Sequence, residues 1–358
     1  MKLKESSQNN TGIILKTFLE SNTVKELRTG FHSKFKKIHF KGNHGSSFSM
    51  YSSAILSNAE NTHVYILKDK EEALYFINDI ENILNTKVLF FPESYRRSYQ
   101  FRESDNSNTL LRAEVLNKLK NLNNNAIVTY PEALSEKVIS KKELHKKTIL
   151  LELEKCYNLD KLKTALYNDR FEYTDFVTDP GQFSIRGGIV DIFSYANEAP
   201  YRIEFDEDKI ESIRTFNVNS QLSIEEQKKA LIIPNTNIKE SIIKKSSLFK
   251  YLNKDCIIWI QDLHFSKLKI DKFYRESIEE FKNNTNKKSL KENDFFINGT
   301  DLIKDIEKFK IFELEKPYFN YQKIITAECL PQLSFNKNID LLLERLRHNN
   351  SNKIKNII

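Results

Sequence analysis

Apolar and polar positions follow two different rhythms along the chain. In the first third, short apolar runs alternate with stretches whose apolar residues recur every three or four positions. Runs of the first kind are typical of buried strands and the second of the helices that cover them, so the pattern predicts a parallel sheet with crossover helices. The expected strands are Lys37–Phe40, His63–Leu67, Lys87–Phe91 and Ala126–Tyr130, and the expected helices are Ser49–Leu56, Glu71–Leu84 and Thr109–Leu122.

Between residues 147 and 234 the pattern changes to short strands separated by turn residues. One helical pattern, Leu159–Tyr167, comes first. The turn residues at Asp179-Pro180-Gly181, Asn197–Pro200 and Asp206–Asp208 predict tight connections, because proline presets φ and glycine tolerates positive φ. We therefore expect a β-meander of about four or five strands.

Runs that suit an α/β unit return after Pro234. They predict a helix at Ile238–Tyr251, a buried strand at Cys256–Ile260, a loop at Asn283–Asn298 and an amphipathic segment at Asn338–Arg347. The predicted fold class is therefore α/β, with a parallel-sheet domain that is split in sequence and a β-rich domain inserted between its halves. The predicted boundaries are 1–130 for the first half, 131–234 for the insert, 235–340 for the second half and 341–358 for a linker or the start of a further domain.

Composition is that of a globular protein. Of the 358 residues, 39% are hydrophobic and 11% aromatic, which is enough apolar surface to form cores despite 29% charged residues. Cys156, Cys256 and Cys329 are isolated from one another, so neither a disulfide framework nor a metal site is expected. Since no apolar run has the length of a signal peptide core or a membrane span, we expect a cytoplasmic protein without a membrane partner.

The net charge of +7 raises the possibility of nucleic-acid binding, but the charge is unevenly distributed. Residues 171–227 hold four Lys or Arg against twelve Asp or Glu, a net charge near −8, which leaves a net charge near +15 for the rest. Any DNA contact is therefore expected on the α/β domain. The candidate phosphate contacts for this alternative function are Lys34, Lys36, Lys37, Lys41, Arg96 and Arg97.

The segment from Phe40 to Ser49 lies where a phosphate-binding loop would lie, after the first strand and before a helix. A working loop reads GxxxxGK[ST], in which glycines let backbone amides surround the phosphates and the lysine meets their charge. Here Ser47 stands in place of the second glycine and Phe48 in place of the lysine. We interpret the segment as a vestigial phosphate loop without catalytic residues or cofactor, with an unorthodox ATPase and a chance turn as alternatives. Its residues are Gly42, Gly45, Ser46 and Ser49.

Several segments of the middle region occur at fixed spacing. They are Asp179–Phe193 (DPGQFSIRGGIVDIF), Pro200–Phe205 (PYRIEF), Ile210–Phe216 (IESIRTF) and Ser220–Ser223 (SQLS). Together they closely resemble the UvrB-interaction domain of the transcription-repair coupling factor (Mfd) family. Leu89–Pro92, Tyr130–Leu134 and Ser334–Asn338 followed by Leu341-Leu342 are similar to parts of that family's first, UvrB-like domain.

The resemblance implies a degenerate P-loop fold of the RecA and UvrB type and a role in transcription-coupled nucleotide-excision repair of DNA damage. The chain would be a non-catalytic module that recruits UvrA, with at most weak DNA binding. The family's ATP-dependent DNA translocase motor and its contact with RNA polymerase are expected in domains outside these 358 residues. The chain is accordingly expected to be a fragment or a truncated protein, not an enzyme, and ATP would belong to the absent motor.

Strand alternation locates the expected docking face. Phe183 and Ile185 should point to one side of their strand and Ser184 and Arg186 to the other. With the resemblance, the predicted UvrA-binding residues are Arg186, Glu204, Arg202, Ser184 and Tyr173. UvrB tends to carry arginines at the positions matching Tyr173 and Ser184, so this face is less basic here. Affinity for UvrA is therefore expected to depend on Arg186 and on aromatic contact from Tyr173. The alternative is a solvated Arg186–Glu204 ion pair worth less than about 1 kcal/mol.

Overall fold

The computed structural model describes residues 12–94, 106–121, 126–235, 244–284, 295–331 and 334–352. Its largest sheet has seven strands, all parallel to their neighbours. Their order is β17 (Lys323–Thr326), β1 (Lys37–Lys41), β16 (Lys310–Glu313), β15 (Ile257–Ile260), β2 (His63–Ile66), β4 (Ala126–Thr129) and β3 (Leu89–Phe91). β1 from the first part of the chain lies between β17 and β16 from the last part, and β15 is paired with β2, so the predicted α/β unit split in sequence is confirmed.

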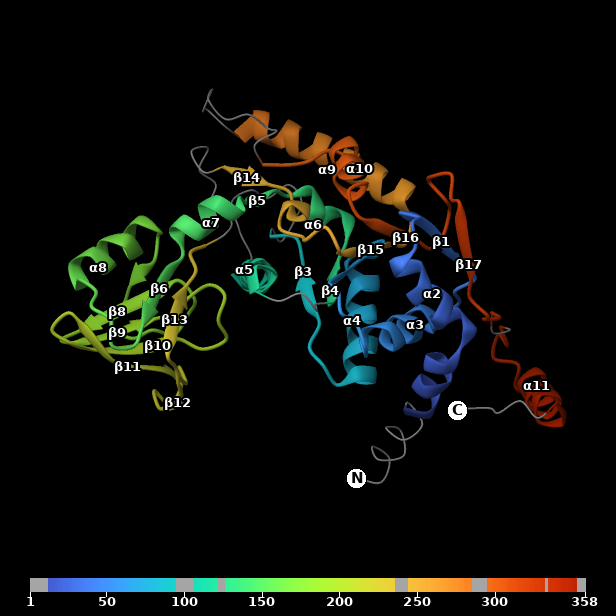
Figure 1. Cartoon of the computed structure of the whole chain (residues 1–358), viewed down its shortest axis with the longest axis horizontal. Coiled ribbons are helices and arrows are strands. Elements are labelled where there is room, and N and C mark those ends of the chain that lie inside the picture. The colour runs from blue at the N-terminus through green and yellow to red at the C-terminus, as the bar shows by residue number, and fades with distance from the viewer. Residues whose placement is uncertain are drawn as a thin grey trace.

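Helices flank this sheet (Figure 1), with α9 (Leu263–Asn284) and α10 (Gly299–Ile306) on one side and α2 (Asn22–His32), α3 (Ser47–Leu56) and α4 (Lys70–Leu84) on the other. The last helix of the first half is α5 (Asn106–Asn121). Local sequence explains where α4 begins. The side chain of Asp69 accepts a hydrogen bond from the Glu72 amide, and acidic residues occupy the first turn, where the helix dipole has its positive end. Its buried residues, Ala73, Phe76, Ile77 and Ile80, recur at helical spacing.

The core of the parallel sheet contains a row of aromatic rings. Trp259 on β15 lies beside Tyr65 on β2 and Phe312 on β16, with ring centroids 5.9 Å and 4.4 Å apart. The buried indole donates its N–H to Nδ1 of His63 at 2.9 Å. Burial lowers the pKa of His63 to about 3, so this ring is the neutral acceptor that the indole needs.

The second sheet is separate and has its own core. Its order is β12 (Ser223–Glu226), β11 (Lys209–Phe216), β10 (Tyr201–Asp206), β9 (Ile189–Ile192), β8 (Gln182–Arg186) and β7 (Glu172–Tyr173). All pairs are antiparallel except β7 with β8. Its apolar face packs with α8 (Leu159–Asn168) and with the antiparallel pair β6 (Ile149–Glu152) and β13 (Lys229–Ile232). The predicted β-rich insert is thus present, and β8 to β12 form its meander.

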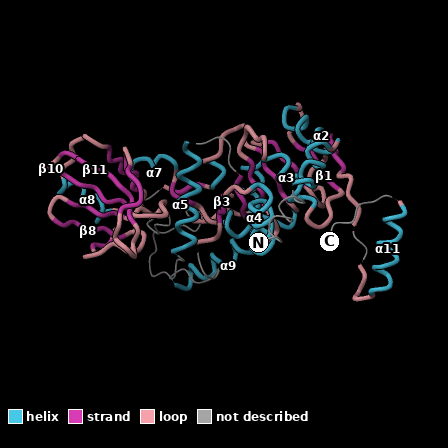
Figure 2. Tube along the Cα trace, turned by 90° about the horizontal axis from the view of Figure 1, so that it is seen from below, coloured by secondary structure: helices cyan, strands magenta, loops and turns pink. Residues whose placement is uncertain are grey.

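Short elements connect the two bodies (Figures 1 and 2). The chain leaves through α6 (Pro131–Ser135), β5 (Val138–Ile139) and α7 (Lys141–Lys147), and β14 (Lys245–Ser246) pairs antiparallel with β5 on the way back. Lys87 beside β3 forms an ion pair with Glu198 in the insert. The insert is therefore attached at one end of the α/β body.

Two segments differ from the expectation. The predicted helix Ile238–Tyr251 is wrong where it can be compared: residues 244–251 form β14 and the 3-10 turn η1 (Leu248–Lys250), because Leu248, Phe249 and Tyr251 all turn into the core. Residues 236–243 lie outside the described residues, as does most of the predicted loop Asn283–Asn298, although α9 extends to Asn284. The final amphipathic segment forms α11 (Ile339–Ser351), which lies apart from the sheet and buries none of its residues. Over the described ranges, no helix is long and apolar enough to cross a membrane.

Candidate docking surface

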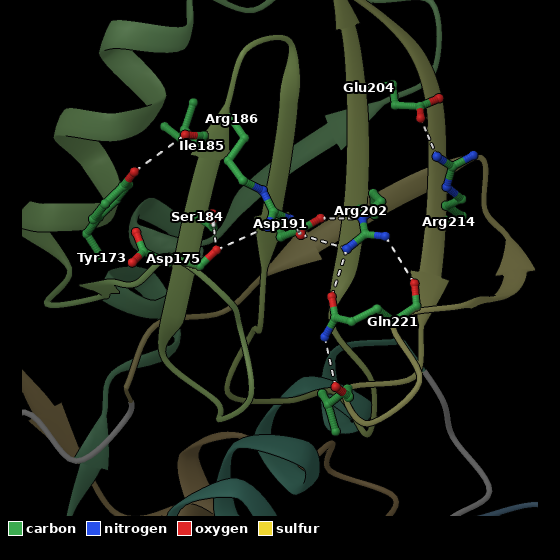
Figure 3. Close-up of polar contacts among 11 residues, drawn as sticks. Tyr173, Asp175, Ser184, Ile185, Arg186, Asp191, Arg202, Glu204, Arg214 and Gln221 are labelled. Carbon is green, nitrogen blue, oxygen red and sulfur yellow. Dashed lines mark hydrogen bonds and ion pairs between the residues drawn. The ribbon is translucent and has the colours of Figure 1, made fainter.

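Asp191 lies at the centre of the polar face of the second sheet, with only 1% of its side chain exposed. In the strand register it is opposite Ser184 on one side and Arg202 on the other. Arg202 donates from Nε to Oδ1 at 2.8 Å and from Nη2 to Oδ2 at 2.9 Å, and Arg186 donates from Nη2 to Oδ2 at 2.7 Å (Figure 3). One buried carboxylate is therefore held by two guanidinium groups, which compensates the cost of burying its charge.

Arg202 is mostly buried, and it holds Asp191 in place from beneath the surface. Its remaining donors bond the backbone carbonyl and the side-chain oxygen of Gln221, at 3.2 and 3.1 Å, and its guanidinium lies 4.3 Å from the ring of Phe216. The hydrogen bond to Asp191 is the largest cause that raises the pKa of Arg202. The main role of Arg202 is thus to position Asp191, and little of its side chain is left for contact with a partner.

Arg186 is the more accessible of the two arginines, with 39% of its side chain exposed. Its Nη1 donates to the backbone carbonyl of Asp175 at 3.2 Å, and the buried hydroxyl of Ser184 donates to the same carbonyl at 3.1 Å. These bonds fix the guanidinium against the sheet. Ser184 therefore acts from below the surface, by holding the segment that Arg186 also binds.

Glu204 has partners other than Arg186. It accepts a hydrogen bond from Ser212 at 2.6 Å and pairs with Arg214. The Ser212 bond is the largest cause that lowers the pKa of Glu204. Both Arg186 and Glu204 are opposite Ile189, so strand β9 separates them by about 10 Å of sheet. The alternative of a direct Arg186–Glu204 pair is therefore not what the structure has.

Tyr173 lies at the β7 edge and faces away from the two arginines. It is paired with Phe183, and its ring meets the Phe183 ring edge-on at 5.5 Å, on the apolar side of the sheet. Its hydroxyl lies 3.5 Å from the carbonyl of Ile185 (Figure 3). The structure thus brings Arg186, Arg202, Ser184 and Glu204 to one face and places Tyr173 at its margin.

The β8–β9 turn is built from the two glycines that follow Arg186. Gly187 has a φ of +61°, and a Cβ at Gly188 would lie 2.6 Å from the carbonyl oxygen of Phe205. Since Arg186 pairs directly with Ile189, these glycines form a two-residue hairpin turn. No side chain from this turn covers Arg186.

Sequence reasoning missed the residues that organise this face, Asp191 and Asp175. Asp191 alternates with the buried Val190 and Ile192, so its polar-face position could have been found from the same period-two pattern. Its pairing with two arginines depends on the strand register, for which the sequence carries no comparable signal. Asp175 lies outside the strands, where alternation does not apply.

The segment interpreted from its sequence as a vestigial phosphate loop lies between β1 and α3. Gly42 and Gly45 have φ values of +85° and +53°, and Ser46 begins the helix without a side-chain cap. Gly42, Gly45, Ser46 and Ser49 line a hollow of about 400 Å³ together with Glu72, Asp79 and Glu315. Phe48 stacks on Phe76 at 5.1 Å, within the aromatic core. The side chains that line this hollow thus include three carboxylates beside neutral polar and apolar groups.

One of the basic residues proposed for DNA contact already has an acidic partner. Lys37 pairs with Glu307 at 2.8 Å and lies 3.5 Å from the centre of the Phe319 ring. Arg96 and Arg97 lie outside the described residues. The described part of the chain also has no group of three or more His, Cys, Asp or Glu side chains arranged to hold a metal ion.

Comparison with known proteins first defines the class of the inserted domain. The family model described as the UvrB interaction domain matches residues 149–237, which run from β6 past β13 and include the whole second sheet. Asp191 and its partners Arg186 and Arg202 form the Asp191 cluster, and the domain that carries it is thus similar to UvrB interaction domains.

The similarity then extends to particular proteins. The transcription-repair-coupling factor of Bacillus subtilis (strain 168) is 30% identical over 214 residues, which cover 59% of this chain and 18% of that protein. The factor of Escherichia coli (strain K12) is 25% identical over 171 residues, 48% of this chain and 15% of its own length. That of Rickettsia conorii (strain ATCC VR-613 / Malish 7) is 31% identical over 172 residues, 47% and 15% respectively. The predicted resemblance to transcription-repair-coupling factors is therefore confirmed over about half the chain, and the matches span less than a fifth of these relatives.

Proposed function

We propose that this chain acts in transcription-coupled nucleotide-excision repair by docking UvrA on the polar face of its inserted sheet. The observation that carries the proposal is the match of residues 149–237 to the UvrB interaction domain, because that segment contains every residue of the Asp191 cluster. A rigid arginine on a sheet with an uncovered flank is suited to pair with a carboxylate of a partner.

Within this face we assign different tasks to the five expected residues. Arg186 and Glu204 are exposed enough to contact UvrA directly, and Tyr173 can do so only at the edge of the sheet. Arg202 and Ser184 position the others, since one holds Asp191 and the other holds the carbonyl of Asp175. Loss of direct contacts should weaken docking with little effect on folding, whereas loss of positioning residues should affect both.

We further propose that the phosphate loop contributes shape and not ATP chemistry. A lysine is absent where the β- and γ-phosphates would lie, and Glu72, Asp79 and Glu315 around the hollow oppose a polyphosphate. Docking, in contrast, needs no nucleotide at this loop.

The test is titration of this chain with UvrA, with Arg186→Ala compared with wild type at low and high salt. Lys209→Ala is the matched control, because Lys209 is an exposed cation on β11 of the same sheet. We expect saturable binding by wild type and by the control, and binding weaker by about tenfold or more in Arg186→Ala. Absence of saturable binding by wild type, with retention of DNA that disappears on adding salt, would instead favour the nucleic-acid function.

A further inference from the structure

Phe176 is a large apolar side chain that the inserted domain leaves 62% exposed. The backbone on both sides of it is fixed. On one side, the carbonyl of Asp175 accepts hydrogen bonds from Ser184 and Arg186. On the other, Val177 is completely buried in a small cluster with Phe193 and Phe216. The ring of Phe176 is therefore held outward by its neighbours and is not the loose end of a mobile turn.

The ring also belongs to the Arg186 side of the sheet. The guanidinium carbon of Arg186 lies 5.1 Å from the centre of the Phe176 ring, within the range of a cation–π contact. Arg186 in turn is held by Asp191 and by the Asp175 carbonyl. An aromatic ring and a guanidinium thus form one preorganised unit, and little side-chain entropy remains to be lost when a partner binds it.

We propose that Phe176, and not Tyr173, is the aromatic anchor of the docking face, and that it meets an apolar pocket on UvrA beside an exposed carboxylate. This inference rests on the proposed docking function. Tyr173 turns its ring to Phe183 on the other side of the sheet, which leaves the aromatic position beside Arg186 to Phe176. Exposed aromatic residues next to arginines are typical of the residues that carry most of the energy of protein interfaces.

Charge complementarity favours a carboxylate over a nucleic-acid phosphate backbone. Two guanidinium groups and one carboxylate give the Arg186–Asp191–Arg202 cluster a net charge of +1. The segment around it, residues 171–227, has a net charge near −8, from four Lys or Arg against twelve Asp or Glu. A polyanion would be repelled by this segment, whereas a single carboxylate at the position of Arg186 would meet the local positive charge.

The experiment compares Phe176→Ala with Leu222→Ala in titrations against UvrA. Leu222 is the matched control, because it is 70% exposed in the same domain. It lies next to β12, which three strands separate from β8 in the sheet. We expect Phe176→Ala to weaken binding by about tenfold and Leu222→Ala to bind as wild type does. Both variants should keep the wild-type melting temperature, since both side chains are exposed.

Two further variants test the unit and its partner chemistry. The double variant Phe176→Ala/Arg186→Ala should lose less affinity than the product of the two single effects, because the ring and the guanidinium contact each other. Arg186→Gln, which is neutral, should reduce the dependence of affinity on salt, as expected if Arg186 pairs with a carboxylate.

The outcomes separate the two proposals. Normal binding by Phe176→Ala together with weak binding by Arg186→Ala overturns the role of Phe176 and leaves docking intact. If the affinity of Arg186→Gln depends on salt as that of wild type does, the proposed pairing of Arg186 with a carboxylate of UvrA is wrong. If wild type shows no saturable binding to UvrA, both the proposed function and this inference are wrong.

Discussion

Asp191 and Arg202 are joined by two parallel hydrogen bonds across neighbouring strands, 2.8 and 2.9 Å long, beneath the surface that carries Arg186. The arrangement is bidentate, and the carboxylate that it holds has almost no contact with water. This pair therefore fixes the carboxylate to which the exposed Arg186 donates its hydrogen bond.

Removing the carboxylate should damage the insert more than removing either arginine. Asp191→Ala leaves Arg186 and Arg202 close together without their counter-charge, so we expect the free energy of unfolding to fall by about 3–5 kcal/mol. Urea denaturation followed by circular dichroism measures this change. Asp206→Ala, at an exposed position of β10, is the control and should change stability by less than about 0.5 kcal/mol. A similar small loss for Asp191→Ala would contradict the structural role of the cluster.

A half-buried carboxyl group, that of Glu93, makes stability depend on pH. Burial, followed by the neighbouring Glu136 and Glu132, raises the pKa of Glu93 from 4.5 to about 7. The folded state therefore favours the protonated form, and its stabilising contribution is complete below the ordinary pKa and is lost as pH rises through about 7. We expect the urea midpoint of wild type to fall between about pH 5 and about pH 8, and to fall less in Glu93→Gln. Equal slopes in the two proteins would rule out Glu93 as the cause.

Lys310 closes the end of α2. Its ammonium group donates to the carbonyls of Gly30, Ser33 and Phe35 at 2.9, 2.6 and 3.1 Å, and burial lowers its pKa. Lys310→Met keeps much of the volume but leaves three carbonyls without this donor, so we expect a loss of about 1–3 kcal/mol in chemical denaturation. Lys308→Met provides the comparison, because the half-exposed Lys308 should contribute less than about 1 kcal/mol. Its buried partner Asp305 keeps the hydrogen bond from Ser247. If Lys308→Met loses as much unfolding free energy as Lys310→Met, the role of Lys310 at the end of α2 is wrong.

Restoring the missing lysine should not restore a nucleotide site. Phe48 packs with Phe76, Tyr65 and Trp259, so Phe48→Lys places an ammonium among aromatic rings and should cost about 1–3 kcal/mol. We expect ATP with magnesium to leave the melting temperature of both wild type and variant unchanged. A nucleotide-dependent rise in wild type that Ser49→Ala removes would instead indicate a working site.

The sequence predicts this fold where local pattern decides the structure. Alternation correctly separates Phe183 from Arg186, because a strand with one buried face obeys a period of two. It gives no information about Phe176, which lies outside a strand. Nor does it say which carboxylate meets Arg202, since that depends on the register between the neighbouring strands β9 and β10. The helix expected at Ile238–Tyr251 fails for a related reason: Leu248, Phe249 and Tyr251 are apolar at helical spacing, but they are buried by a 3-10 turn against the sheet.

The ends of the inserted domain lie next to each other. Ile149 at the start of β6 is paired with Ile232 at the end of β13, so the points of entry and exit are only about 5 Å apart. A segment with such ends can be lost, gained or exchanged while the two halves of the parallel sheet keep their own pairing. The polar face with Arg186 is therefore attached to its host through one pair of adjacent chain positions, and the strand order of the parallel sheet does not pass through it.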